Sequence, residues 1–159
     1  MKKEEKSGVN TSSKKNILIT ATALLIILAD QLTKFLVARN MQPNDSIPII
    51  TNALHLTYVQ NEGAGFGMMQ GYQILLIILS IALLGAIIYY YKRIPPTTSY
   101  SLITGMIVGG IIGNLIDRIA LGYVVDFIDF RVWPVFNIAD SCLTIAVAIM
   151  IVESLRIKK

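Results

Sequence analysis

The hydrophobic residues of the chain gather into four long runs that are separated by polar or mixed segments. A helix rises about 1.5 Å per residue, so roughly 20 apolar residues are needed to cross a hydrocarbon core of about 30 Å. Each run is long enough, and its apolar residues are continuous instead of being spread at amphipathic spacing. The pattern predicts four membrane-spanning helices at about residues 16–38, 73–91, 100–119 and 135–153.

The connection between the first two runs, from about residue 40 to 72, is too long to be a simple turn. Within it, segments 47–51 and 53–59 contain β-branched residues in an alternating pattern, which favours strands. We therefore expect a small extracytoplasmic β element between the first and second helices.

The connection between the third and fourth runs, around residues 121–134, is rich in aromatic residues. Aromatic rings concentrate where a membrane meets water. This connection is therefore expected to be an interfacial segment that lies flat on the bilayer. Its rings belong to Tyr123, Phe127, Phe130 and Trp133.

The composition supports a membrane protein and excludes several other classes. Of the 159 residues 54% are hydrophobic and 15% charged, and the mean hydropathy is +0.62, which makes a water-soluble enzyme improbable. The single cysteine, Cys142, and the single histidine exclude an internal disulfide and a Cys/His zinc site. We expect no metal and no cofactor.

The charges predict how the chain is oriented in the membrane. The formal net charge is +4, and basic residues precede the first run, lie between the second and third, and follow the fourth. The positive-inside rule then places both termini in the cytoplasm, as an even number of spans requires. We expect an all-α integral membrane protein: a single domain over residues 1–159, a four-transmembrane-helix bundle oriented N-in/C-in. Its polar cytoplasmic tail, residues 1–15, is expected to be disordered as far as residue 13.

Charged and amide side chains inside the predicted spans lie at one level, near the outer face. At about 1.5 Å per residue, Asp30 and Asn114 lie roughly 22 Å, and Asp140 roughly 20 Å, from the inner ends of their runs. The inner halves of the runs contain no charge. A transporter or proton channel needs ionisable groups across the whole membrane, so this class is the weaker candidate.

Helical spacing indicates which polar residues share a face. Residues three or four apart on a helix point the same way, so each of the following sets can face one bundle interior. The sets are Asp30 with Lys34, Asn114 with Asp117 and Arg118, and Asn137 with Asp140.

Glycines on the third run have two expected uses. Gly105, Gly109 and Gly113 recur every four residues, which allows a neighbouring helix to approach closely. Gly110 is offset from that stripe and lies one turn before Asn114, so we expect it to leave room for a ligand backbone.

Two carboxyl groups are candidates for catalysis. Asp126 follows the third run and Asp140 lies one turn into the fourth, with the helix breaker Pro134 between them. Two carboxylates in a half-desolvated site repel each other, which raises the pKa of one and leaves the other ionised. Such a pair can activate a water as base and protonate a leaving nitrogen as acid, which is aspartic proteolysis.

Two alternatives remain open on the residues alone. The polar cluster could be a structural hydrogen-bonded network, with Asp30 paired to Lys34 and an aspartate paired to Arg118, because buried charges demand partners. A non-catalytic lipid or protein chaperone, or a transporter, could use the same cluster.

Five motifs, taken in order, resemble the bacterial lipoprotein signal peptidases, also called signal peptidase II. The combination is specific, and it spans residues 30–140. The motifs are DQLTK at 30–34, NEGAGFG at 61–67, GGIIGNLIDR at 109–118, VVDF at 124–127 and FNIAD at 136–140.

The resemblance implies an intramembrane aspartic endopeptidase that removes the signal peptide from a diacylglyceryl-modified prolipoprotein, cutting just before the lipidated cysteine. It implies a bacterial cytoplasmic (inner) membrane location, with the active site near the extracytoplasmic face, and inhibition by globomycin. The expected partners are the substrate and membrane lipids, with no nucleic acid, and the chain is expected to be a monomer. By motif position, the resemblance assigns Asp126 and Asp140 as the catalytic pair, Asn61, Gly110, Asn114, Arg118 and Asn137 as substrate-binding residues, and Asp30, Lys34 and Asp117 as structural supports.

Overall fold

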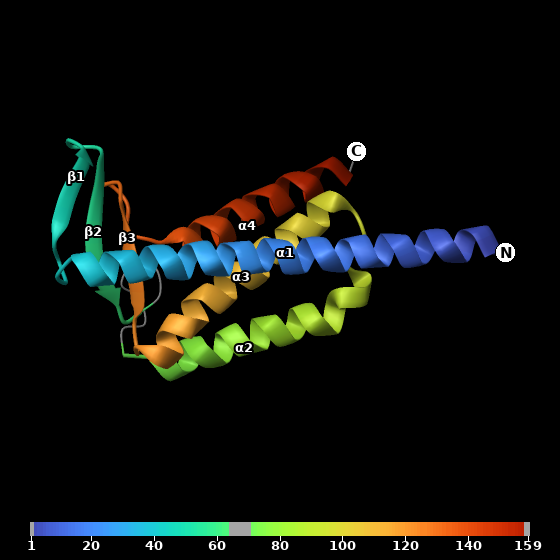
Figure 1. Ribbon diagram of the computed structural model, residues 1–159, viewed down its shortest axis with the longest axis horizontal. Coiled ribbons are helices and arrows are strands. Elements are labelled where there is room, and N and C mark those ends of the chain that lie inside the picture. The colour runs from blue at the N-terminus through green and yellow to red at the C-terminus, as the bar shows by residue number, and fades with distance from the viewer. Residues whose placement is uncertain (1, 64–70, 158–159) are drawn as a thin grey trace.

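Four long helices and a small sheet make up the structure, a computed structural model that describes residues 2–63 and 71–157. Each helix contains a stretch long and apolar enough to cross a membrane, which confirms the four predicted spans. Figure 1 shows the helices along one axis and the sheet at one end of the bundle. Helix α3 contacts the other three helices, so it is the centre of the bundle. The helices are α1 (Lys2–Asn40), α2 (Gln73–Tyr90), α3 (Thr98–Ala120) and α4 (Ile138–Ile157), and a short 3-10 helix, η2 (Tyr91–Arg93), follows α2.

Two helix starts differ from the prediction. Helix α1 begins at Lys2, so the expectation of disorder before residue 14 was wrong. Helix α4 begins three residues later than expected, because Phe136 forms a β-bridge with Ile128 and the Asn137 side chain accepts a hydrogen bond from the Asp140 N–H. An asparagine in this position caps a helix, so Asn137 both begins α4 and orients its first turn.

The sheet has three antiparallel strands in the order β1-β2-β3. Strands β1 (Ser46–Ile50) and β2 (Leu54–Asn61) are the β element predicted between the first two helices. The third strand, β3 (Val124–Asp129), comes from the connection between α3 and α4, where the sequence analysis expected an interfacial segment and predicted no strand. Pairing with β2 satisfies the backbone hydrogen-bonding groups along one edge of β3, and five of its six side chains are buried.

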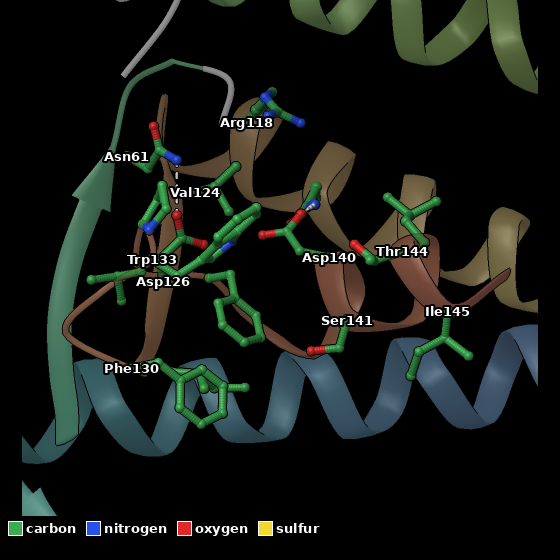
Figure 2. Close-up of a pocket in the computed structure, with 16 residues that line it drawn as sticks. Asn61, Arg118, Val124, Asp126, Phe130, Trp133, Asp140, Ser141, Thr144 and Ile145 are labelled. Atoms are coloured by element: carbon green, nitrogen blue, oxygen red, sulfur yellow. Dashed lines mark hydrogen bonds between the residues drawn. The ribbon is translucent and has the colours of Figure 1, made fainter. Parts of the chain in front are cut away.

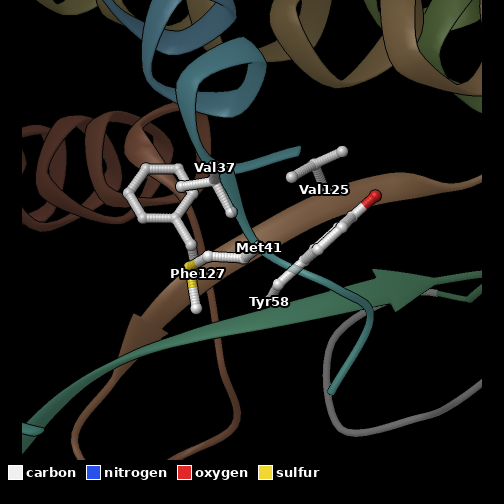
Figure 3. Packing of buried hydrophobic residues seen from close by; sticks show 5 residues of the cluster. All are labelled: Val37, Met41, Tyr58, Val125 and Phe127. Carbon is white, nitrogen blue, oxygen red and sulfur yellow. The ribbon is translucent and has the colours of Figure 1, made fainter. Parts of the chain in front are cut away.

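A small hydrophobic core joins the end of α1 to the sheet (Figure 3). Its members are Val37 and Met41 from α1, Tyr58 from β2, and Val125 and Phe127 from β3. Successive side chains of a strand point to opposite faces. Because Val125 and Phe127 pack into this core, the residue between them, position 126, is directed to the other face of β3.

Glycines allow α1 and α3 to pack closely, as predicted. A Cβ at Gly105 would lie 2.6 Å from Thr22 Cβ, and one at Gly109 would lie 3.0 Å from the Ala23 carbonyl oxygen. A side chain at either position would force the two helices apart. The close approach positions the polar residues of α1 against those of α3.

Candidate active site

Polar residues from four elements meet in one cavity of about 770 Å³ beneath the sheet. Asn61 ends β2, Asp126 lies in β3, Asp140 lies in the first turn of α4, and Asn114 and Arg118 come from the C-terminal part of α3. Figure 2 shows the two carboxyl groups directed into the same space, with an oxygen of Asp140 facing Asp126. Residues that are distant in the sequence thus form one polar site.

Amide groups hold both carboxyl groups in position. Asp126 accepts hydrogen bonds from the Nδ2 groups of Asn61 (2.8 Å) and Asn137 (2.7 Å). Asp140 accepts one from Asn114 Nδ2 (2.7 Å). Asn137 Nδ2 also lies 3.0 Å from Asn114 Oδ1, so a continuous chain of amides joins the two carboxyl groups. Neither carboxyl group forms an ion pair with a cation among the described side chains, those of residues 11–63 and 71–155.

The environment of Asp126 favours its protonated form. The residue is 1% exposed. Burial raises the pKa of its carboxyl group to about 7, and the carboxylate of Asp140 raises it as well, while hydrogen bonds from Asn61 and Asn137 and the charge of Lys34 lower it. A carboxyl group with this pKa is partly protonated at neutral pH, as an acid in a carboxyl pair must be.

A second group of buried charges lies next to the cavity. Lys34 Nζ is 2.7 Å from Asp30 Oδ2, 3.0 Å from Asp117 Oδ2 and 3.0 Å from Asn114 Oδ1. The predicted pairing of Asp30 with Lys34 is therefore confirmed, and Asp117 is a second partner of the same lysine. All three charged side chains are at most 3% exposed.

The same charged group connects the helices to the strand that carries Asp126. Asp30 Oδ1 accepts a hydrogen bond from the Ala139 N–H (2.9 Å), at the start of α4. Asp117 Oδ2 accepts one from the Val125 N–H (3.1 Å), in β3. These bonds tie α1 to α4 and α3 to β3, so they fix the two elements from which Asp126 and Asp140 project.

Arg118 has a different environment from the one expected for a structural network. Its Nη2 lies 3.4 Å from the Gly63 carbonyl oxygen, and its buried Nε has no hydrogen-bond partner among the described residues. Among the described side chains Arg118 forms no ion pair with an aspartate. The pairing of Arg118 with an aspartate, which the structural alternative required, is therefore not found. The guanidinium group instead lines the cavity beside the two carboxyl groups.

The space that we expected beside Gly110 is filled by α4. A Cβ at this position would lie 2.6 Å from Leu143 Cγ and 2.8 Å from the Ala139 carbonyl oxygen. Gly110 is not among the residues that line the cavity. The structure therefore gives this glycine a role in helix packing, and the expected room for a ligand backbone is not there.

Two features of the site escaped the sequence analysis. Gln31 Nε2 donates to Asp117 Oδ1 (2.9 Å) and to the Gly113 carbonyl oxygen (3.1 Å), and its position beside Asp30 in DQLTK was the available signal. Phe130 and Trp133, expected only as membrane anchors, line the cavity. Residues 64–67 of the NEGAGFG motif lie outside the described residues.

The sequence of this chain is similar to those of known membrane proteases. The sequence pattern of the family described as Signal peptidase (SPase) II matches residues 22–156. A lipoprotein signal peptidase of Halothermothrix orenii is 46% identical over 134 residues, which cover 84% of this chain and 92% of that protein. A lipoprotein signal peptidase of Caldanaerobacter subterraneus is 44% identical over 126 residues, which cover 79% of this chain and 87% of that protein.

A solved structure shares the fold. It is described as a bacterial membrane enzyme, and it superposes with a TM-score of 0.83 at 34% sequence identity, covering 87% of each chain. The sequence comparisons and the fold comparison thus lead to the same family. The chain belongs to the signal peptidase II family of membrane proteases.

Proposed function

We propose that this chain is an aspartic endopeptidase that removes signal peptides from diacylglyceryl-modified prolipoproteins, cutting just before the lipidated cysteine. Removal of the signal peptide from prolipoproteins is the activity to which the family's name refers. The observation that carries the aspartic mechanism is the placement of Asp126 and Asp140 in one cavity, with amide partners and with no paired cation among the described side chains.

The lining of the cavity suits a substrate that is both lipid and peptide. One part is apolar and contains Phe130, Trp133 and Ile145, and the other contains the two carboxyl groups and Arg118. A membrane-embedded signal helix and a diacylglyceryl group require apolar walls, whereas the scissile peptide bond requires hydrogen-bonding groups. Asn61, Asn114, Asn137 and Arg118 are proposed to hold the peptide backbone beside the carboxyl groups.

The proposed reaction uses one proton shared between the two carboxyl groups. The ionised carboxylate takes a proton from a water molecule, and the oxygen of that water attacks the scissile carbonyl carbon. The protonated carboxyl group gives its proton to the leaving nitrogen as the C–N bond breaks. The products are a signal peptide with a new carboxyl terminus and a lipoprotein whose first residue is the lipidated cysteine.

The test compares two substrates that differ only in the lipid. Purified protein in detergent is incubated with a prolipopeptide that carries diacylglycerol on its cysteine and with the same peptide without it, and the products are identified by mass spectrometry. We expect cleavage of the lipidated peptide alone, at the bond before the cysteine. Binding without a shortened product would contradict the peptidase assignment and favour a chaperone, and cleavage of both peptides would contradict the proposed lipid requirement.

Inhibition, oligomeric state and orientation in the membrane are the remaining parts of the proposal. We propose that the cyclic peptide globomycin inhibits cleavage by occupying the cavity, and that the protein acts as a monomer in the bacterial inner membrane with its cavity near the extracytoplasmic face. Inhibition that falls as substrate concentration rises would support the shared site. Labelling of a cysteine introduced at Asn52, which follows β1 and is exposed, by a membrane-impermeant reagent on intact cells would support the orientation.

A further inference from the structure

A second cavity, of about 360 Å³, lies at the end of the bundle opposite the sheet. It is formed where α1 passes the connection between α2 and α3, and Figure 1 shows this connection at the far end from the three strands. None of the residues that line it takes part in the proposed proteolysis. They are Thr11, Lys14, Lys15, Leu18, Pro96, Thr97, Thr98 and Ser101.

The lining of this second cavity is cationic and rich in hydroxyl groups. It contains two lysines and several threonine and serine side chains, and it includes no aspartate or glutamate. Helix α3 begins beside it, with Thr97 as its N-cap. The first N–H groups of a helix lack acceptors within the helix and carry partial positive charge, which favours an anion at this position.

Lys15 places a nearly buried positive charge at the wall of this cavity. The side chain is 6% exposed, and its Nζ donates to the carbonyl oxygens of Tyr91 (2.8 Å) and Ile94 (2.9 Å) and lies 4.0 Å from the centroid of the Tyr91 ring. It forms no ion pair with any carboxylate whose side chain is described, in residues 11–63 and 71–155. Burial of an ammonium group without a counter-charge is costly, and an anion in the adjoining cavity would supply that charge.

The surroundings indicate that the anion belongs to a lipid. Ile17, one turn after Lys14, is 66% exposed, and Leu102, one turn after Thr98, is 39% exposed. The surface thus changes to aliphatic within one turn of each helix, from cationic on α1 and from hydroxyl-bearing on α3, as at the boundary between phospholipid headgroups and acyl chains. A free phosphate ion would use the charges and leave the aliphatic surface uncovered.

We propose that this cavity binds the phosphate group of an anionic phospholipid, with Lys14, Lys15 and Thr98 as its contacts and the acyl chains along Ile17 and Leu102. The lipid would neutralise Lys15 and join α1 to the α2–α3 connection. The site is independent of the proteolytic mechanism, so its test does not depend on activity.

The experiment measures lipid binding to the purified full-length protein by native mass spectrometry. Phosphatidylglycerol and phosphatidylcholine with identical acyl chains are the probes, and we expect preferential retention of phosphatidylglycerol. Lys14→Gln removes an exposed charge from the cavity and should weaken that binding roughly fivefold. Lys92→Gln is the matched control, because it removes one exposed charge at the same end of the protein but outside the cavity, and it should leave binding close to that of wild type.

A second variant and a competitor complete the test. Thr98→Val replaces a hydroxyl group by a methyl group of similar size and should also weaken phosphatidylglycerol binding, with cleavage of the lipidated peptide unchanged. Equal losses in Lys14→Gln and Lys92→Gln would overturn the proposal in favour of diffuse surface attraction, as would equal retention of the two lipids. Displacement of the lipid by millimolar inorganic phosphate would overturn the lipid assignment in favour of a soluble phosphate ligand.

Discussion

Two pairs of carboxyl groups lie side by side in this protein, and they are stabilised in different ways. Asp30 and Asp117 both contact the ammonium group of Lys34, at 2.7 and 3.0 Å. Asp126 and Asp140 have neutral amide donors as partners. Asp30, Asp117 and Asp126 are buried and Asp140 is half-buried, so the clearest difference between the two pairs is the kind of partner.

The partner determines what each pair can do. A carboxylate next to an ammonium group stays ionised and fixed, which suits a structural support. A buried carboxyl group whose hydrogen-bond partners are neutral amides has a raised pKa, as burial gives Asp126. The charged pair therefore fixes the geometry, and the amide-held pair remains free to exchange a proton.

The largest effect is expected from Asp126→Asn or Asp140→Asn. Either substitution keeps the shape of the side chain but removes the group that accepts or donates a proton, so kcat for the lipidated peptide should fall by roughly 10⁴-fold. The free energy of unfolding should change by less than about 1 kcal/mol, because the lost hydrogen bond is offset by removal of a buried charge. Peptide cleavage and detergent-based unfolding are measured on the same samples, and near-normal turnover by either variant would reject the assigned pair.

The same isosteric change at Asp30 should have the opposite consequences. Asp30→Asn places an amide N–H against the ammonium group of Lys34 and breaks a buried ion pair, which costs about 3 kcal/mol of unfolding free energy. The fraction that remains folded should keep kcat within about tenfold of wild type, since Asp117 still holds Lys34. Retained stability with abolished cleavage would show that the charged pair takes part in the chemistry, and the comparison would fail.

The sequence predicted the elements of the fold better than their assembly. The four spans could be recognised because each apolar run is long, and the strands of the first connection because they alternate and are adjacent in sequence. Strand β3 was missed because its partner, β2, lies more than 60 residues earlier, and its six residues resemble an interfacial segment.

The site was predicted in part. Helical spacing indicated the sets on each helix, and the family resemblance indicated the roles. Spacing could not show that Lys34 contacts Asp117 as well as Asp30, because that contact depends on how closely α1 packs against α3. The prediction for Gly110 failed for the same reason. The sequence of α3 does not show whether the space beside this glycine is open to a ligand or filled by Leu143 of α4.

A glycine substitution disturbs the charged pair without changing any charge. A Cβ at Gly113 would lie 2.7 Å from Asp30 Oδ2, so Gly113→Ala must displace the carboxylate that holds Lys34. We expect a loss of about 2 kcal/mol in unfolding free energy and a smaller loss in kcat. Gly85→Ala in α2 is the matched control, because nothing lies within 4 Å of its added Cβ. Equal stability of the two variants would show that α1 and α3 tolerate separation at this level.

The smallest effect is a shift in pH dependence, and it tests the amide-held pair alone. Cleavage should fall as pH rises through the pKa of Asp126, about 7, because the pair then loses the proton that it must give to the leaving nitrogen. The hydrogen bond from Asn61 lowers this pKa, so Asn61→Ala should raise it and move the falling limb of the kcat profile to higher pH by roughly half a unit to one unit.

A neighbouring residue on the same strand provides the control for this shift. Gln60 donates to the hydroxyl groups of Tyr58 and Tyr123 instead of to a carboxyl group, so Gln60→Ala should leave the falling limb in place. A loss of kcat at all pH values in Asn61→Ala, with no movement of the limb, would mean that Asn61 contacts substrate without tuning Asp126. A limb that moves to lower pH would contradict the sign of the hydrogen bond's effect, and with it the conclusion that the Asn61 amide lowers the pKa of Asp126.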